Sequence, residues 1–127
     1  MEITKLTTAT PGRTRTVFPL PDLDPEFSVT LRELSDTEQA RIYDKNNYMP
    51  GRKDATMQKL ARITSDAIRQ RVVGWSNFTE NGTEIACEGD NKLKLYSTEI
   101  FIDGESKTLW QLTLEAEQRQ KVDEQKN

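Results

Sequence analysis

The sequence predicts a small α+β domain that is mostly helical, with an N-terminal β-hairpin and a second short hairpin around Asn81-Gly82. Three observations carry this prediction. Apolar and polar residues alternate over 14–20 and 27–32, which is the periodicity of a β-strand. Apolar residues recur at helical spacing over 55–73. Asn-Gly is the dipeptide that favours a type I′ hairpin turn.

A chain of 127 residues fits one domain of ordinary size. Residues 1–13 are threonine-rich and contain Pro11-Gly12, so they predict a flexible arm. Residues 14–121 predict a single globular domain. Residues 122–127 predict a frayed tail, because the sequence after Ala116 contains one apolar residue only.

The N-terminal hairpin is predicted from two alternating runs on either side of a proline-bounded turn. Each run places its alternate residues on one side, namely Thr14, Thr16, Phe18 and Leu20 in the first and Phe27, Val29 and Leu31 in the second. Pro19 cannot donate a backbone hydrogen bond, which indicates that the first strand lies at the edge of the sheet.

Two helices are expected next. Ser35 and Glu38 have the spacing of a capping box, and the helix that they begin should end near Lys45. Asp54 can cap a second helix over 55–73, with Gly74 as its left-handed stop. The buried face of that helix would consist of Met57, Leu60, Ala61, Thr64, Ala67, Ile68 and Val72.

The second half of the chain is less regular. Counting outward from Asn81-Gly82 pairs Phe78 with Ile85 across the hairpin. Residues 91–101 are ambiguous, because Leu93, Tyr96 and Ile100 have the spacing of a helix, whereas Ile100-Phe101-Ile102 before Asp103-Gly104 suits a strand. Ser106 can cap a last helix over about 107–121.

Residue composition argues against catalysis. The chain has no histidine, which removes the commonest general base and metal ligand, and Cys87 is its only cysteine. No glycine-rich phosphate loop is present. We therefore expect no enzymatic activity, no metal and no cofactor. We also expect no membrane association, because no apolar run approaches the ~20 residues of a membrane span, and the N-terminus lacks an export signal.

Charge is distributed unevenly. The whole chain has a formal net charge of -3, yet residues 41–73 carry 8 basic and 3 acidic side chains. A basic patch is therefore possible on the second helix, formed by Arg52, Lys53, Lys59, Arg62 and Arg69. The patch could bind a polyanion, or it could be a solvated face on which Asp66 pairs with Arg62 and Arg69. No aromatic residues alternate with these cations, so we expect no nucleic-acid binding.

Large apolar residues in two places are candidates for contact with a protein partner. Trp75 and Phe78 follow the second helix, where they either pack as core or anchor a partner. The last helix carries a wide apolar arc of Leu109, Trp110, Leu112 and Leu114. A chain with 34% hydrophobic residues should have difficulty covering that arc, so we expect a partner or a second copy to bind there.

The order of these elements resembles that of tail assembly chaperones of tailed bacteriophages. The resemblance covers roughly residues 27–96 and is carried by the segments FSVTLRELS, LARITSDAIRQRVVGW, SNFTENGTEIA and NKLKLY. Its most suggestive part is the helix that ends in VVGW before an acidic Asn-Gly hairpin. Residues 97–127 depart from the pattern.

The resemblance implies a function without catalytic residues. A chaperone of this kind is made during tail morphogenesis in the host cytoplasm and is absent from the finished particle. It binds the tape measure protein and recruits tail tube proteins around it. Two alternatives stay open, namely a structural head–tail joining or tail completion protein, and a small phage inhibitor of a host enzyme or nucleic-acid complex.

Overall fold

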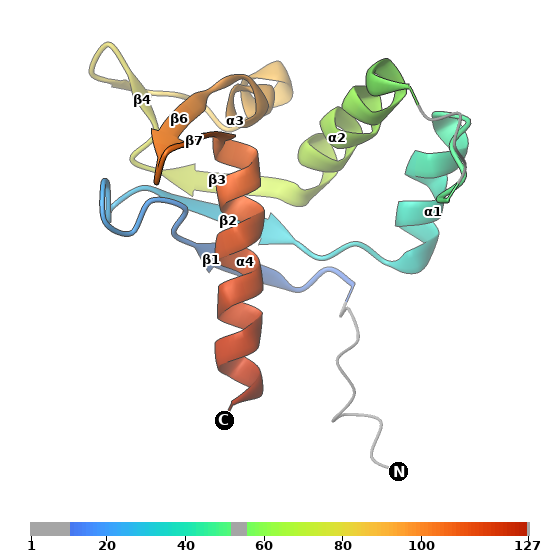
Figure 1. Cartoon of the computed structure of the whole chain (residues 1–127), viewed down its shortest axis with the longest axis horizontal. Coiled ribbons are helices and arrows are strands. Elements are labelled where there is room, and N and C mark those ends of the chain that lie inside the picture. Colours follow the sequence, from blue (N-terminus) through green and yellow to red (C-terminus); the bar gives the residue numbers. More distant parts are fainter. Residues whose placement is uncertain (1–10, 52–55, 127) are drawn as a thin grey trace.

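The computed structural model describes residues 11–51 and 56–126, which form a small α+β domain, as the sequence predicts (Figure 1). A three-stranded antiparallel sheet lies at its centre, in the order β1-β2-β3. The long helix α4 crosses this sheet, while α1 and α2 extend beyond one end of it. Two small hairpins lie at the other end.

The N-terminal hairpin forms from β1 (Thr14–Val17) and β2 (Ser28–Arg32), with Thr16 opposite Thr30. Strand β1 is at the edge of the sheet, which confirms the prediction from Pro19. The expected buried face of β1 is wrong, because Thr14, Thr16 and Phe18 are exposed. Arg15 and Val17 face inward instead. The alternation of residue types did not predict that Arg15 faces inward, because a charged residue in a strand is normally assigned to the solvent-facing side.

The capping box is confirmed. Ser35 Oγ accepts from the amide of Glu38, and the Glu38 carboxylate accepts from the amide of Ser35. Helix α1 (Asp36–Lys45) follows and ends at Asn46. The predicted cap of the second helix, Asp54, lies outside the described residues, and Thr56 caps α2 (Met57–Arg71).

The end of α2 differs from the prediction. Gly74 is no helix stop, because the chain passes directly from Arg71 into strand β3 (Val72–Ser76). Thr30 pairs with Gly74 and Leu31 with Val72, so Val73 is the extra residue of a bulge. The β-branched pair Val72-Val73 favours extended backbone here, and pairing with β2 satisfies its hydrogen bonds. The third strand of the sheet thus begins with Val72 and Val73, two residues that helical periodicity assigned to the second helix.

Residues 79–108 form short elements on one side of the sheet. The Asn-Gly hairpin is confirmed, with β4 (Thr79–Glu80), β5 (Thr83–Glu84) and positive φ at both turn residues. The amide of Ile85 donates to the carbonyl of Phe78, as the expected pairing requires. A 3-10 turn, η2 (Gly89–Leu93), leads into α3 (Lys94–Ser97), and β6 (Glu99–Ile102) then pairs with β7 (Glu105–Thr108). The ambiguous stretch is therefore helical first and extended later.

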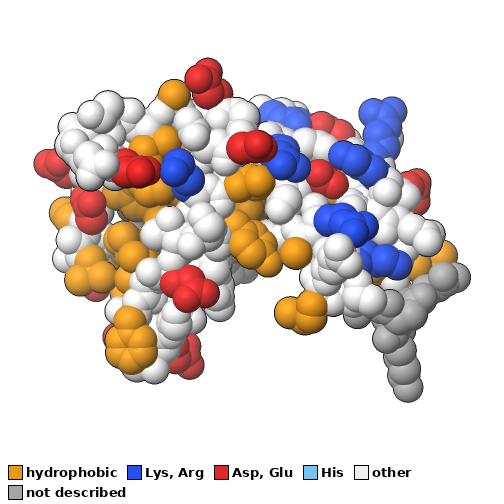
Figure 2. Space-filling model, turned by 90° about the horizontal axis from the view of Figure 1, so that it is seen from above, with side chains coloured by type: hydrophobic (Ala, Val, Ile, Leu, Met, Phe, Trp, Pro, Cys, Tyr) orange, Lys and Arg blue, Asp and Glu red, His pale blue; other side chains and the backbone are white. Residues whose placement is uncertain are grey.

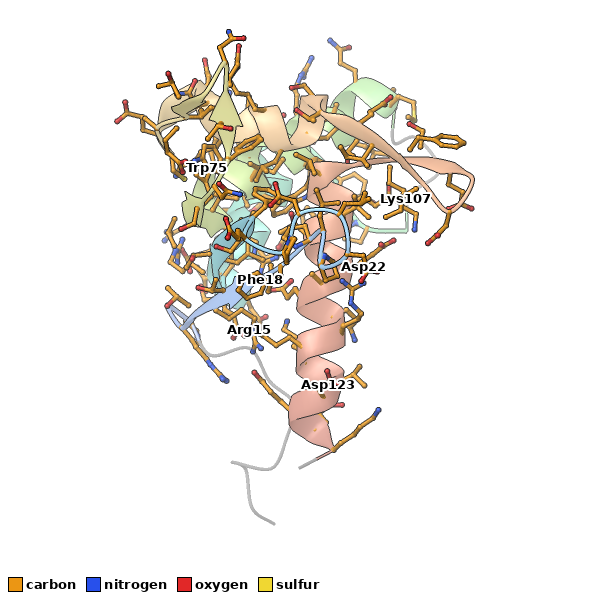
Figure 3. The ribbon with its side chains drawn as sticks, turned by 90° about the vertical axis from the view of Figure 1, so that its left-hand side faces the viewer. Arg15, Phe18, Asp22, Trp75, Lys107 and Asp123 are labelled. Atoms are coloured by element: carbon orange, nitrogen blue, oxygen red, sulfur yellow. The ribbon has the colours of Figure 1, made fainter. Side chains whose placement is uncertain are left out.

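Helix α4 (Leu109–Gln125) is capped by Thr108 and not by Ser106, which lies in β7. It continues to Gln125, past the expected end near 121. Polar contacts with β1 explain its length. Arg15, which lies beside α4 in Figure 3, donates to Gln120 Oε1 at 2.9 Å and to Glu124 Oε1 at 2.8 Å. Gln120 donates in turn to the carbonyl of Thr16. Of the predicted arm 1–13, Gly12 and Arg13 exchange backbone hydrogen bonds with Glu33.

A second ionic contact, between Arg71 of α2 and Glu117 of α4, holds these two helices together. Arg71 makes a two-pronged ion pair with Glu117, and its Nε donates to the carbonyl of Arg32 at 3.1 Å. Glu117 is only 6% exposed. Such a pair holds α2, β2 and α4 in one register, because either ion alone would be costly to bury.

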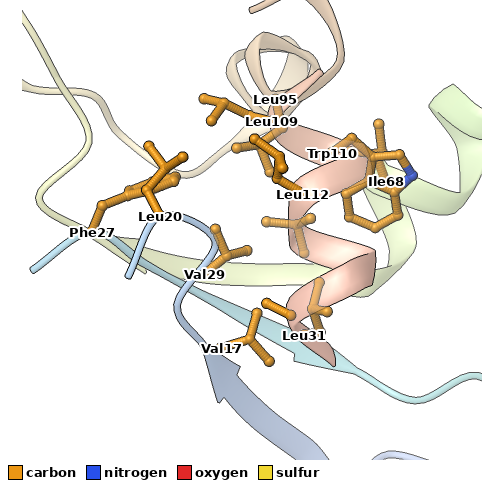
Figure 4. Packing of buried hydrophobic residues seen from close by; sticks show 12 residues of the cluster. Val17, Leu20, Phe27, Val29, Leu31, Ile68, Leu95, Leu109, Trp110 and Leu112 are labelled. Carbon is orange, nitrogen blue, oxygen red and sulfur yellow. The ribbon is translucent and has the colours of Figure 1, made fainter. Parts of the chain in front are cut away.

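The core lies between α4, the inner face of the sheet and the last turns of α2 (Figure 4). Its buried apolar members are Val17, Leu20, Phe27, Val29, Leu31, Ile68, Val72, Leu95, Leu109, Trp110, Leu112 and Ala116. From the face predicted for the second helix, only Ile68 and Val72 belong to it. Met57 is 83% exposed and Leu60 is 38% exposed, because the first turns of α2 extend past the edge of the sheet.

Candidate functional site

The C-terminal apolar arc is not an open surface, so the expected binding site there is wrong for most of its members. Leu109, Trp110 and Leu112 are 3%, 6% and 5% exposed. Leu109 and Leu112 lie toward the sheet and α3, and Trp110 lies beside Ile68 of α2, so the arc is closed within the chain (Figure 4). The arc is covered because β1, β2, α2 and α3 each contribute buried apolar residues to the same core. Leu114 differs, since it points outward and is 38% exposed.

Trp75 and Phe78 are partly buried against the core. Their rings meet edge to face with centroids 4.9 Å apart, and Phe78 also contacts Phe27. Trp75 Nε1 donates to the carbonyl of Ile85 at 2.6 Å. These contacts hold the Asn-Gly hairpin against the sheet, which favours the packing role over the role of partner anchor.

A groove about 500 Å³ in volume runs along α2 beside the end of α1. It is lined by Lys45, Asn46, Gln58, Ala61, Arg62, Ser65, Asp66 and Arg69. Arg62 and Arg69 come from the predicted basic patch, and Lys59 lies nearby with its Nζ donating to the carbonyl of Asn47. Arg52 and Lys53 lie outside the described residues.

Asp66 organises one wall of this groove. It is 9% exposed and accepts hydrogen bonds from Asn46 Nδ2 at 2.9 Å and Lys45 Nζ at 3.5 Å. Arg69 approaches the same carboxylate at 3.6 Å, which confirms one of the two expected pairs. The second cation is Lys45 of α1 and not Arg62. Asp66 therefore connects the two helices, a role that helical spacing within α2 could not reveal.

Cations outnumber carboxylates in the groove. Lys45, Arg62 and Arg69 line it with Asp66 as their single acidic neighbour in the lining. Figure 2 shows lysine and arginine side chains gathered over the α1–α2 end of the molecule. The rest of the chain is acidic, with 6 basic and 11 acidic side chains in residues 74–127. The groove can therefore attract a negatively charged group to one end of an acidic protein.

Uncovered apolar side chains lie at the same end. Met57 and Leu60 occupy the first turns of α2, and Met49, which is 57% exposed, lies in the connection that precedes it. We call Met49, Met57 and Leu60 the apolar tip. The sequence pattern assigned two of its members to the core, because it shows which face of a helix is apolar and not how far the supporting sheet extends.

Other reactive groups give no comparable cluster. Burial raises the pKa of the Cys87 thiol, and thiolate is the nucleophilic form. Within residues 11–51 and 56–126, no three acidic or cysteine side chains are grouped so that they could hold a metal ion. No helix in this part of the chain has the length and apolar character needed to cross a membrane.

Comparison of the chain with models of protein families, with curated proteins and with solved structures gives no match. The α1–α2 end, with its cationic groove and apolar tip, is thus identified from geometry and chemistry alone.

Proposed function

We propose that this chain is a non-enzymatic chaperone of phage tail assembly, which binds the tape measure protein in the host cytoplasm and helps to recruit tail tube proteins around it. The observation that carries the proposal is the apolar tip, which is exposed beside a cationic groove on a small acidic body. The resemblance of residues 27–96 to tail assembly chaperones supports the same function, since that segment contains both helices of the site.

The chemistry of the apolar tip suits a chaperone. Two of its three side chains are methionines, whose flexible thioethers adapt to apolar partners of different shape. The tip is small, so the contact that it makes should be weak enough for polymerising tube subunits to displace. An acidic body also helps to keep a complex with an aggregation-prone client in solution.

Co-expression with the tape measure protein of the same phage tests this proposal. We expect the wild-type chain to raise the soluble fraction of the tape measure protein. The double variant Met57→Ser, Leu60→Ser should lose most of that effect, because it removes the exposed side chain of Met57 and the exposed part of Leu60. Leu23→Ser is the matched control, since Leu23 is 63% exposed in the turn between β1 and β2.

Two results would refute the proposal. One is a soluble fraction that is the same with and without the chain. The other is recovery of the chain from purified phage particles in a fixed ratio to tail tube protein, which would indicate a structural tail completion protein.

A further inference from the structure

We infer that the groove between α1 and α2 binds the carboxylates of an acidic helical segment in the partner protein, with Arg62 as the main contact. This inference rests on the proposed function, because it assumes that the partner is a protein. It adds the chemistry by which that partner would be recognised.

The shape of the groove matches a helix. Its α2 residues recur at helical spacing from Gln58 to Arg69, so it follows α2 for about 16 Å at 1.5 Å per residue. Ala61 and Ser65 are the small side chains of its lining and lie one turn apart. Ser65 Oγ already donates to the carbonyl of Ala61, so it requires no hydrogen bond from a ligand. Small side chains in this position allow the backbone of a second helix to approach closely.

The charges of the groove select the partner. Asp66 is already occupied by Asn46, Lys45 and Arg69. The guanidinium of Arg62 makes no hydrogen bond or ion pair with any residue in the described ranges, and the residue is exposed. An arginine of this kind can hold a carboxylate through two parallel hydrogen bonds. Lys45, whose side chain is 73% exposed, can receive a second carboxylate about one turn further along, because its Nζ lies 3.5 Å from Asp66, four residues after Arg62.

The same surface is poorly suited to nucleic acid. No aromatic side chain lines the groove, so bases would have no ring on which to stack. Met57 lies one helical turn from Ala61 and adds an exposed apolar contact next to the cations. A surface with cations on one side and an apolar residue on the other fits an amphipathic helix with glutamates beside leucines.

Two synthetic helical peptides provide the test. The first carries glutamates at i, i+4 and i+7 beside a row of leucines, and the second has lysines in place of the glutamates. Fluorescence anisotropy should show that the full chain binds the acidic peptide more tightly than the basic one, and that added salt weakens this binding. Arg62→Glu should weaken binding of the acidic peptide at least about tenfold. Arg62→Ala, which adds no negative charge beside Asp66, should weaken it by a smaller factor.

Arg119→Glu is the matched control, because Arg119 is an exposed arginine on α4 and the charge change is the same. It should leave the affinity unchanged. The inference is overturned if the acidic peptide does not bind, if both peptides bind equally, if Arg119→Glu and Arg62→Glu have equal effects, or if single-stranded DNA binds more tightly than the acidic peptide.

Failure of this inference can be told apart from failure of the proposed function. If Arg62→Glu keeps the tape measure protein soluble while the Met57→Ser, Leu60→Ser variant does not, the client binds through the apolar tip and not through carboxylates. The function would then stand without the acidic segment.

Discussion

Replacement of Trp110 by alanine tests whether the core closes over the C-terminal helix. The side chain is 6% exposed and belongs to the core cluster, with Ile68 of α2 beside it (Figure 4). Removal of a buried tryptophan of this kind costs about 3–5 kcal/mol, through lost burial and the cavity that remains. A domain of this size has a total stability of about 5–15 kcal/mol. Trp110→Ala should therefore lower the free energy of unfolding by about a fifth or more.

Urea unfolding followed by far-ultraviolet circular dichroism measures this loss, since the helical signal does not depend on the removed indole. Phe101→Ala is the matched control, because Phe101 is 76% exposed in the β6–β7 hairpin, and its effect should stay within about 0.5 kcal/mol. A loss below about 1 kcal/mol for Trp110→Ala, with an unchanged dependence on urea concentration, would refute the packing described above.

Three further predictions concern the ionic contacts and the second hairpin. Glu117→Ala should cost about 3 kcal/mol or more in urea unfolding because it leaves the buried Arg71 without its carboxylate. Asp90→Ala, which removes an exposed partner of Arg69, should cost less than about 1 kcal/mol, and equal effects would contradict the structural role of the Arg71–Glu117 ion pair. Arg32 holds the pKa of Glu38 at about 2, below its usual 4.5, so the stability difference between wild type and Glu38→Gln should be constant above pH 4.5 and disappear as the pH falls toward 2; a difference that persists at pH 2 would exclude this ion pair as its source. Gly82→Ala should cost about 1 kcal/mol or more in thermal or urea unfolding, since φ at this position is +78°, and no loss would mean that the turn is not of type I′.

The local elements were predictable where short-range chemistry decides them. The capping box at Ser35 and Glu38 and the Asn-Gly turn follow from hydrogen bonds and φ preferences within four residues. Neither depends on the rest of the fold, and both are present in the structure.

The tertiary arrangement was predictable only in part. The sequence places Arg15 on the solvent-facing side, yet it is buried because it forms hydrogen bonds with Glu33, Gln120 and Glu124, which come from distant parts of the chain. Met57 reads as a core position, yet it lies beyond the sheet. Periodicity identifies the apolar face of an element, but the length of the element that supports it decides which residues are covered.

In the candidate site, too, some features were predictable from the sequence and others were not. The cations of α2 were visible in the sequence, and Asp66 was correctly paired with Arg69. Lys45 and Asn46 were missed as part of the site, because their contact with Asp66 spans about twenty residues and depends on how α1 turns back on α2. The C-terminal arc was misassigned for the opposite reason. Its apolar residues were counted correctly, but the sheet and α3 cover most of them.

Hydrogen exchange of the full chain, with and without the tape measure protein, tests most directly whether the α1–α2 end is the partner-binding surface. Amide groups of α1 and of the first half of α2 should exchange more slowly in the complex, because the client covers the apolar tip and the groove. Amides of the β6–β7 hairpin and of the last turns of α4 should exchange at the same rate in both states. Protection confined to α4 around Leu114 and Val122, with none in α1 or α2, would contradict the account.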